Sequence, residues 1–151
     1  NNWKVLDCIW NDLNKTNYLF KKYNNPIYHD LHPHNILFSK NKAFILDHDS
    51  FILGSVQSAM GFSILKFLKY MHDNSYKKSF ESESNELFNI WIKAFSEHFP
   101  NKFKKEEILK FGKAEIFRRF LSMIDKAYKK IPSSFNGPEV HLDTLLMAQK
   151  I

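Results

Sequence analysis

The chain contains few of the residues that form flexible loops, cross-links and membrane spans. Only 4 glycines occur in 151 residues, and they form no glycine-rich phosphate-binding loop. The single cysteine, Cys8, excludes an internal disulfide framework, fits a reducing compartment, and is expected to be a small buried hydrophobe. Because no apolar run reaches about 18 residues, we expect a cytoplasmic protein with no membrane partner.

The composition is that of a globular protein with a large aromatic core. Hydrophobic residues make up 44% of the chain and aromatic residues 16%, including 15 phenylalanines. This content predicts a single domain, residues 1–151. The aromatic residues at helical spacing are expected in its core: Phe62, Phe67, Trp91, Phe95, Phe117 and Phe120.

The formal net charge of +6 is compatible with a phosphate-bearing ligand or with nucleic acid. The lysines are scattered among Asn and Glu, however, which favours a solvated surface and no nucleic-acid partner. Solvated helix faces are expected to carry the densest basic residues: Lys102, Lys104, Lys105, Arg118 and Arg119. An RNA-binding helical domain is the alternative that this charge leaves open.

The spacing of apolar residues predicts a mainly helical α+β fold with one small β-hairpin. Short apolar runs at 36–38 and 43–46 flank the polar residues 39–42, which is typical of a hairpin. Pro33 and its polar neighbours indicate that residues 28–34 form no regular structure. Helices are expected over residues 3–23 with a break near 14–17, over 56–71, from Ser82 or Ser84 to Pro100, over 105–130, and from Pro138 to Leu146.

The inward faces of the two central helices follow from the same periodicity. They are expected to be Leu87, Ile90, Trp91 and Phe95 in one helix, and Ile108, Phe111, Ile116, Phe117, Phe120, Leu121 and Ile124 in the next.

Three residues in and after the polar loop form a candidate site for phosphoryl transfer. Asp30 and Asn35 precede the hairpin, and Asp47 follows it. Because the hairpin is short, its two ends return to nearly the same place, so Asn35 and Asp47 are expected to face one ion. Phosphoryl transfer requires a carboxylate that orients the attacking hydroxyl, together with oxygen ligands that hold magnesium.

These segments also resemble the motifs of a known family. Residues 29–37 (HDLHPHNIL) and 45–49 (ILDHD) look like the two catalytic motifs of the aminoglycoside phosphotransferase and choline kinase-like kinases. The usual form is HGDLHxxNIL, a short hairpin, and then ID followed by an aromatic residue and an acid. The resemblance is tight only over about residues 28–50, and it implies the C-terminal lobe of a protein-kinase-like fold.

The resemblance implies a role for each matching residue. Asp30 would be the catalytic base, and Asn35 and Asp47 would be ligands of Mg2+, with ATP as the phosphoryl donor. Asp49 matches a second acid with a metal or structural role, and His32 matches a histidine that supports the loop.

Two departures from the family pattern bear on activity. Tyr28 stands where the family has a histidine that orients the loop, so Tyr28 is expected to take a supporting role. The residues before Tyr28 read as helix and include no strand lysine for the nucleotide phosphates. We therefore expect a catalytic loop and metal hairpin at 28–50 and a helical substrate subdomain at 56–151, cut from a longer protein or completed by an N-terminal lobe in cis or in trans.

The first hypothesis is thus an ATP- and Mg2+-dependent kinase that phosphorylates a hydroxyl of a small molecule. The acceptor is an aminoglycoside, a sugar or a choline-like amino alcohol, bound between the loop and the helices at 56–73 and 84–98. The local acids that suit an aminoglycoside are Glu81, Glu83 and Glu86. The alternative is a catalytically impaired, pseudokinase-like binding module. A metal site built from His29, His32, His34 and His48 and an aromatic cage for a quaternary ammonium group are further alternatives.

Overall fold

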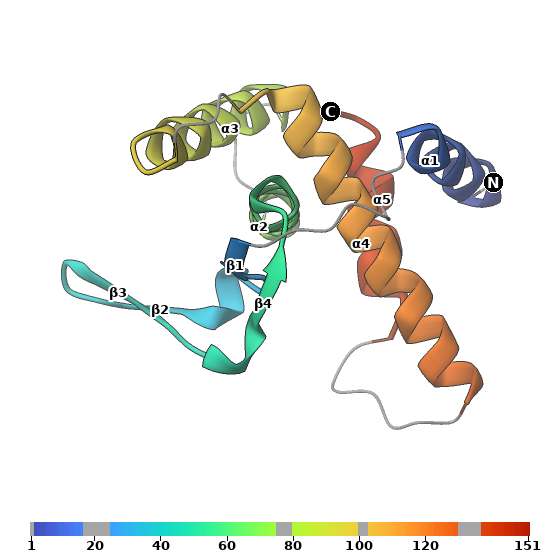
Figure 1. Cartoon of the computed structure of the whole chain (residues 1–151), viewed down its shortest axis with the longest axis horizontal. Helices are drawn as coiled ribbons and strands as arrows, with labels where there is room; N and C mark the ends of the chain where they lie inside the picture. The colour runs from blue at the N-terminus through green and yellow to red at the C-terminus, as the bar shows by residue number, and fades with distance from the viewer. Residues whose placement is uncertain (1, 17–24, 75–79, 100–102, 130–136) are drawn as a thin grey trace. The chain divides into compact units, whose positions relative to one another are not determined.

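The computed structural model describes residues 2–16, 25–74, 80–99, 103–129 and 137–151 (Figure 1). Within these ranges the protein is mainly helical with two small antiparallel sheets, which confirms the α+β class. None of the helices in the described ranges combines the length and apolarity that a membrane crossing requires. Contacts divide the chain into two compact units, residues 22–112 and residues 1–21 with 113–151, and each is described by itself.

The first unit contains four short strands. The predicted hairpin is confirmed: β2 (Ile36–Ser39) pairs with β3 (Lys42–Ile45), with Ile36 opposite Ile45. A second sheet was not predicted, in which β1 (Asn25–Tyr28) pairs with β4 (Phe51–Gly54). Its strands have four residues each and lie far apart in sequence, so no local turn signal indicated the pairing. The expectation of no regular structure at 28–34 was therefore wrong at Tyr28, which ends β1, and at the 3-10 turn η2 (Pro33–Asn35).

The two sheets differ in how much of their surface is covered. Ile27 of β1 is buried, and β1 lies against α2 (Val56–Asp73) (Figure 1). The opposite face of this sheet is open, with Phe51 at 61% and Leu53 at 67% exposure. The hairpin extends away from α2 and exposes large apolar side chains on both of its faces: Leu37, Phe38, Phe44 and Ile45. Apolar surface of this extent is typical of a region that another surface covers.

Helix α2 is the buried centre of the first unit, as its apolar sequence predicted. Ser55 caps its N-terminus, because the Ser55 hydroxyl accepts a hydrogen bond of 3.2 Å from the Ser58 amide. The side chains that α2 buries completely or nearly so are Met60, Phe62, Ile64, Leu65 and Leu68.

Helix α3 (Phe80–Ser96) begins earlier than predicted, so Ser82 and Ser84 lie within the helix and do not cap it. Its inner face is built around Phe88, which is fully buried, whereas Ile90 is 56% exposed and was wrongly expected to point inward. Apolar periodicity defines a stripe on a helix, but the packing against α2 decides which edge of that stripe is covered. Trp91 and Phe95 are half-buried. Pro100, the expected end of this helix, lies outside the described residues.

A contact between two glycines joins α2 to the start of α4 (Lys105–Tyr128). A Cβ atom on Gly61 would lie 2.2 Å from the Ile108 carbonyl oxygen, and one on Gly112 would lie 2.5 Å from the Gly61 carbonyl carbon. Both distances are below any real contact, and the obstructing atoms are backbone, which cannot swing aside. The close approach of these helices therefore requires glycine at both positions.

The second unit comprises α1 (Asn2–Thr16), the later part of α4 and α5 (Glu139–Ala148). The predicted continuation of the first helix beyond residue 16 and the loop at 130–136 lie outside the described residues. The buried side chains of this unit include Leu6, Ile9, Ile116, Phe117, Phe120, Leu145 and Met147.

Three expectations for this unit were wrong. Cys8 is exposed, because it lies on the polar side of α1, opposite the stripe formed by Leu6 and Ile9. Leu121 and Ile124 are 43% and 40% exposed, since the covered part of the α4 stripe ends near Phe120.

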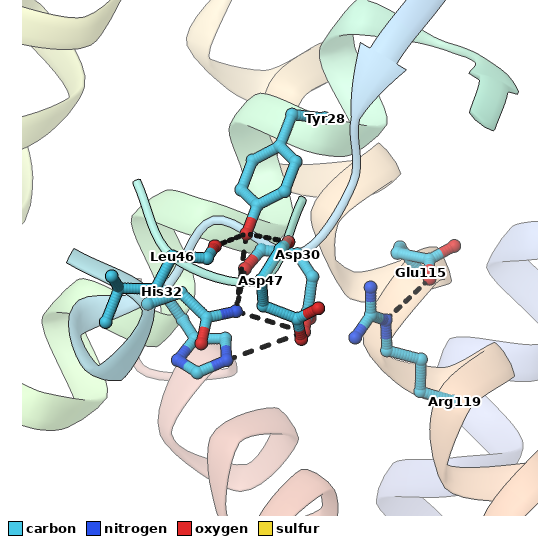
Figure 2. A network of polar contacts seen from close by, with 8 residues as sticks. Tyr28, Asp30, His32, Leu46, Asp47, Glu115 and Arg119 are labelled. Atoms are coloured by element: carbon cyan, nitrogen blue, oxygen red, sulfur yellow. Dashed lines mark hydrogen bonds and ion pairs between the residues drawn. The ribbon is translucent and has the colours of Figure 1, made fainter. Parts of the chain in front are cut away.

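The basic pair on α4 is held by a buried acid. The Glu115 carboxylate, 7% exposed, accepts hydrogen bonds from Arg118. It also accepts one from Arg119 Nε at 2.9 Å, and Figure 2 shows this contact. Arg118 keeps a largely exposed side chain, as expected of a solvated face, whereas the side chain of Arg119 is only 19% exposed.

Replacing either glycine of the α2–α4 contact with alanine should destabilise the protein. Helix propensity alone would favour alanine by about 1 kcal/mol. The backbone overlap at Gly61 or Gly112 should outweigh this gain and lower the free energy of unfolding by about 2–3 kcal/mol, measured by urea denaturation. Gly137→Ala is the matched control, because its Cβ atom meets only the movable carboxylate of Glu139. A gain in stability from Gly61→Ala would contradict the contact.

Candidate functional site

The candidate site is built on the loop that leaves β1. Asp30 follows the strand directly, and the His29 amide donates to the Ser50 carbonyl at 3.0 Å, which extends the pairing with β4 by one step. The Asn35 amide then donates to the His32 carbonyl at 2.9 Å, closing η2 as a tight turn. The loop is thereby held at both ends by backbone hydrogen bonds.

The two ends of the hairpin meet, as predicted. The Leu46 amide donates to the Asn35 carbonyl at 2.8 Å, directly beyond the last cross-strand pair of Ile36 and Ile45. Asp47 is the next residue after Leu46. The hairpin therefore brings Asp47 to the same end of the structure as Asn35.

The side chain of Asn35 is oriented by Asp30. Its Nδ2 atom donates to the Asp30 backbone oxygen at 3.0 Å and approaches Asp30 Oδ2 at 3.4 Å. Because the nitrogen is held by Asp30, the amide oxygen is the atom of Asn35 that is left to bind a cation. Asn35 and Asp30, which the sequence grouped as metal ligand and base, are thus in direct contact.

Tyr28 joins the loop to the exit of the hairpin. Its hydroxyl lies 2.8 Å from the Leu46 carbonyl oxygen and 3.1 Å from that of Asp47, and it accepts from Asn35 Nδ2 at 3.4 Å. Figure 2 shows the Tyr28 ring pointing from its strand toward Leu46 and Asp47. Partial burial raises the pKa of the Tyr28 phenol, and the nearby carboxylates of Asp30 and Asp47 raise it further, so it is a neutral donor at physiological pH.

Asp47 has a strained backbone. Its φ of 56° and ψ of 72° place it in the left-handed region, which is uncommon for a residue other than glycine. Such strain persists only where the surroundings enforce it. The hydrogen bond from Tyr28 and the 3-10 turn η3 (His48–Ser50), which begins immediately afterwards, are the features that hold it. The carboxylate of Asp47 does not cap this turn, and the residue is exposed.

His32 lies against the candidate base. Its Nε2 atom is 3.5 Å from Asp30 Oδ2, and the two side chains are 23% and 22% exposed (Figure 2). The imidazole can therefore orient the Asp30 carboxylate from the side of the loop, which fits the supporting role expected for His32.

Asp49 and the other histidines are less closely connected. Asp49 lies exposed in η3, and no described contact joins it to Asp30 or Asn35. His29 is buried and stacks on Phe62 with 6.2 Å between the ring centres. Within the described ranges, no three His, Cys, Asp or Glu side chains are grouped so that they could hold a metal together, so the alternative of a histidine metal site gains no support.

The donor atoms present do fit magnesium. Mg2+ prefers oxygen ligands, and it usually takes one or two from protein while water and substrate phosphates supply the rest. The amide oxygen of Asn35 and the exposed carboxylate of Asp47 are ligands of this kind. This mixed amide and carboxylate pair is therefore the candidate cation site.

The structure also brings Tyr70 of α2 to the loop, which sequence reasoning missed. The Tyr70 ring lies edge-on to His34, with 5.9 Å between the ring centres. The sequence held no signal for this contact beyond an aromatic residue near the end of a buried helix.

Comparison of the whole chain with protein-family models, curated proteins and solved structures gave no match.

Removing the Tyr28 hydroxyl should loosen the exit of the hairpin. Tyr28→Phe keeps the contact between this ring and Phe51, but it leaves the carbonyls of Leu46 and Asp47 to water. We expect the free energy of unfolding to fall by about 1 kcal/mol in urea denaturation, and the Leu46 amide to exchange hydrogen faster. Tyr128→Phe, which alters a ring that is 87% exposed, is the control and should change neither quantity.

The loss of stability caused by Tyr28→Phe should depend on pH in a defined direction. Because the folded-state pKa of Tyr28 is raised, the contribution of the neutral phenol is complete below the unfolded pKa of about 10 and is lost as the pH rises through the folded pKa. The stability difference between the natural protein and Tyr28→Phe should therefore shrink above about pH 10. A difference that grows in this range would contradict the assignment.

Proposed function

We propose that the chain is the C-terminal catalytic lobe of an ATP- and Mg2+-dependent kinase that phosphorylates a hydroxyl of a small molecule. The proposal depends mainly on one observation, the hydrogen bonds from Asn35 Nδ2 to Asp30. They hold a candidate base against a candidate magnesium ligand, and the hairpin places Asp47 at the same end. The motif resemblance over about residues 28–50 supports the same reading, with ATP as the donor.

In this mechanism the protein acts by positioning and by charge. Asp30 accepts a hydrogen bond from the acceptor hydroxyl and takes its proton as the oxygen attacks the terminal phosphorus of ATP, whose bond to the bridging oxygen breaks so that ADP leaves. His32 keeps the Asp30 carboxylate in place, and Asn35 and Asp47 would hold the magnesium ion. When bound, the ion neutralises charge on the phosphates. Asp49, which lies in η3, would take the metal-binding or structural role that the resemblance implies.

The geometry of Tyr28 favours an active enzyme over a pseudokinase-like binding module. Tyr28 stands where the family has a histidine, and this replacement is the main sequence argument for lost activity. The Tyr28 hydroxyl nevertheless contacts the Leu46 and Asp47 carbonyls, so the loop and the metal hairpin remain connected. A tyrosine that makes these contacts supports the site.

The exposed apolar faces of the two sheets support a covering lobe. Phe38 of the hairpin is 71% exposed, and Leu53 of β4 is 67% exposed. Asn35 directly precedes β2 of the hairpin, and Asp47 lies between β3 and β4. A lobe that covered the strands, in the same polypeptide or in a partner, would thus lie next to the candidate metal site and could bind the nucleotide phosphates there.

Substitution of the two central carboxylates should abolish catalysis. In the full-length parent protein with ATP and Mg2+, Asp30→Asn should lower acceptor-dependent kcat by about 10²–10⁴-fold, because the amide cannot take the proton. Asp47→Ala should remove measurable turnover at ordinary magnesium concentration, because a ligand of the ion is lost. The measurement is release of ADP with a panel of hydroxyl acceptors.

The matched control is Asp125→Asn. Asp125 is an exposed aspartate on α4 that pairs with Lys129, so its substitution should leave kcat unchanged. Turnover that survives both Asp30→Asn and Asp47→Ala would refute the proposed function.

The isolated chain should bind ATP only weakly. Without a covering lobe, the apolar strands next to the site remain open to water, so we expect a dissociation constant above about 1 mM in calorimetry with Mg2+. Asp47→Ala serves as the reference for binding elsewhere on the surface. Micromolar affinity that Asp47→Ala removes would show that no covering lobe is needed.

A further inference from the structure

Three aromatic side chains form a row that leads away from the candidate base. His32 Nε2 lies 3.5 Å from Asp30 Oδ2, the rings of His32 and His34 are 5.7 Å apart, and those of His34 and Tyr70 are 5.9 Å apart. The successive rings meet edge-on, at 70° and 85°. The row connects the catalytic loop to the C-terminal part of α2.

The outer part of the row is open to solvent. His34 is exposed, and Tyr70 is 41% exposed. Among the described contacts, neither the His34 imidazole nor the Tyr70 hydroxyl uses its polar atoms in a hydrogen bond. Each group can both donate and accept, so together they present donors and acceptors to a molecule that extends outward from Asp30.

On α2, the carboxylate near the outer part of the row is paired with basic groups. Lys69 forms an ion pair with Asp73, and His72 Nδ1 lies 3.6 Å from the same carboxylate. Of the acids considered for an aminoglycoside, Glu83 is 5% exposed, and Glu86 already has an interaction partner. Binding of a polycationic or quaternary ammonium acceptor needs open carboxylates or an aromatic cage. The outer part of the row offers an imidazole and a phenol as hydrogen-bonding groups instead.

We infer that the acceptor is an uncharged, polyhydroxylated molecule of the sugar class, held by His34 and Tyr70. This inference rests on the proposed function, because Asp30 must receive the reacting hydroxyl. The remaining hydroxyl groups then lie along the row and exchange hydrogen bonds with His34 and Tyr70. Convergent donors and acceptors beside a reacting group are how a site fixes the orientation of a small molecule.

The test is the response of the His and Tyr ring signals of the full chain in NMR, with glucose, ribose, kanamycin and choline as separate probes. Glucose or ribose should shift the signals of His34 and Tyr70, and kanamycin and choline should not. His34→Ala and Tyr70→Phe should each weaken the sugar affinity about fivefold, as the loss of one hydrogen bond predicts. His98→Ala and Tyr128→Phe, which alter an exposed imidazole and an exposed phenol outside the row, should leave it unchanged.

Three outcomes would overturn the inference: no response to either sugar, an equal response at His98 and Tyr128, or a stronger response of His34 and Tyr70 to kanamycin or choline. Failure of the proposed function is distinguishable from these. Transfer to kanamycin or choline that depends on Asp30 would leave the kinase proposal standing and reject the sugar. Sugar binding at the row with turnover unaffected by Asp30→Asn would reject the kinase proposal, and with it the role of the sugar as acceptor, and would leave only a sugar-binding site.

Discussion

The hydrogen bond from the Leu46 amide to the Asn35 carbonyl, 2.8 Å long, closes the hairpin onto the loop, and the candidate site depends on this closure. It brings Asn35 and Asp47 to one end of a hairpin that otherwise projects from the fold. The Tyr28 hydroxyl adds a second connection, from β1 to the carbonyls of Leu46 and Asp47. Each of these contacts between the loop and the two ends of the hairpin involves a backbone carbonyl.

Helix α2 supports this arrangement from one side only. Two-stranded sheets are marginal in water without packing, and β1 obtains its packing from α2 through the buried Ile27. The position of α2 is set in turn by the contact of Gly61 with Gly112. The outer face of the β1–β4 sheet and both faces of the hairpin have no such support within the described residues. The part of the fold that carries the candidate metal ligands is therefore also the part with the most exposed apolar surface.

The fold was predictable where a local pattern was strong. The hairpin, the buried α2 and the extent of α4 follow from alternation or helical periodicity within one segment. The sheet of β1 and β4 was not predictable, because its strands are short and pair across a long stretch of sequence. Periodicity also misjudged the exposure of Ile90, Leu121 and Ile124, and residue type misjudged that of Cys8. A helix pattern shows which residues share a face, but only the neighbouring element determines how far that face is covered.

For the candidate site, the sequence by itself determined that Asn35 and Asp47 lie at the same end of the hairpin, because a short hairpin must return its ends to one place. Tertiary structure decided how the site is held: the Tyr28 hydroxyl reaches the Asp47 carbonyl only because β1 pairs with β4, and that pairing has no local signal. It also decided that Tyr70 lies beside His34, since the contact depends on how α2 packs against the loop. Contacts between neighbours in sequence follow from local geometry, whereas contacts between distant segments follow from packing that no single segment encodes.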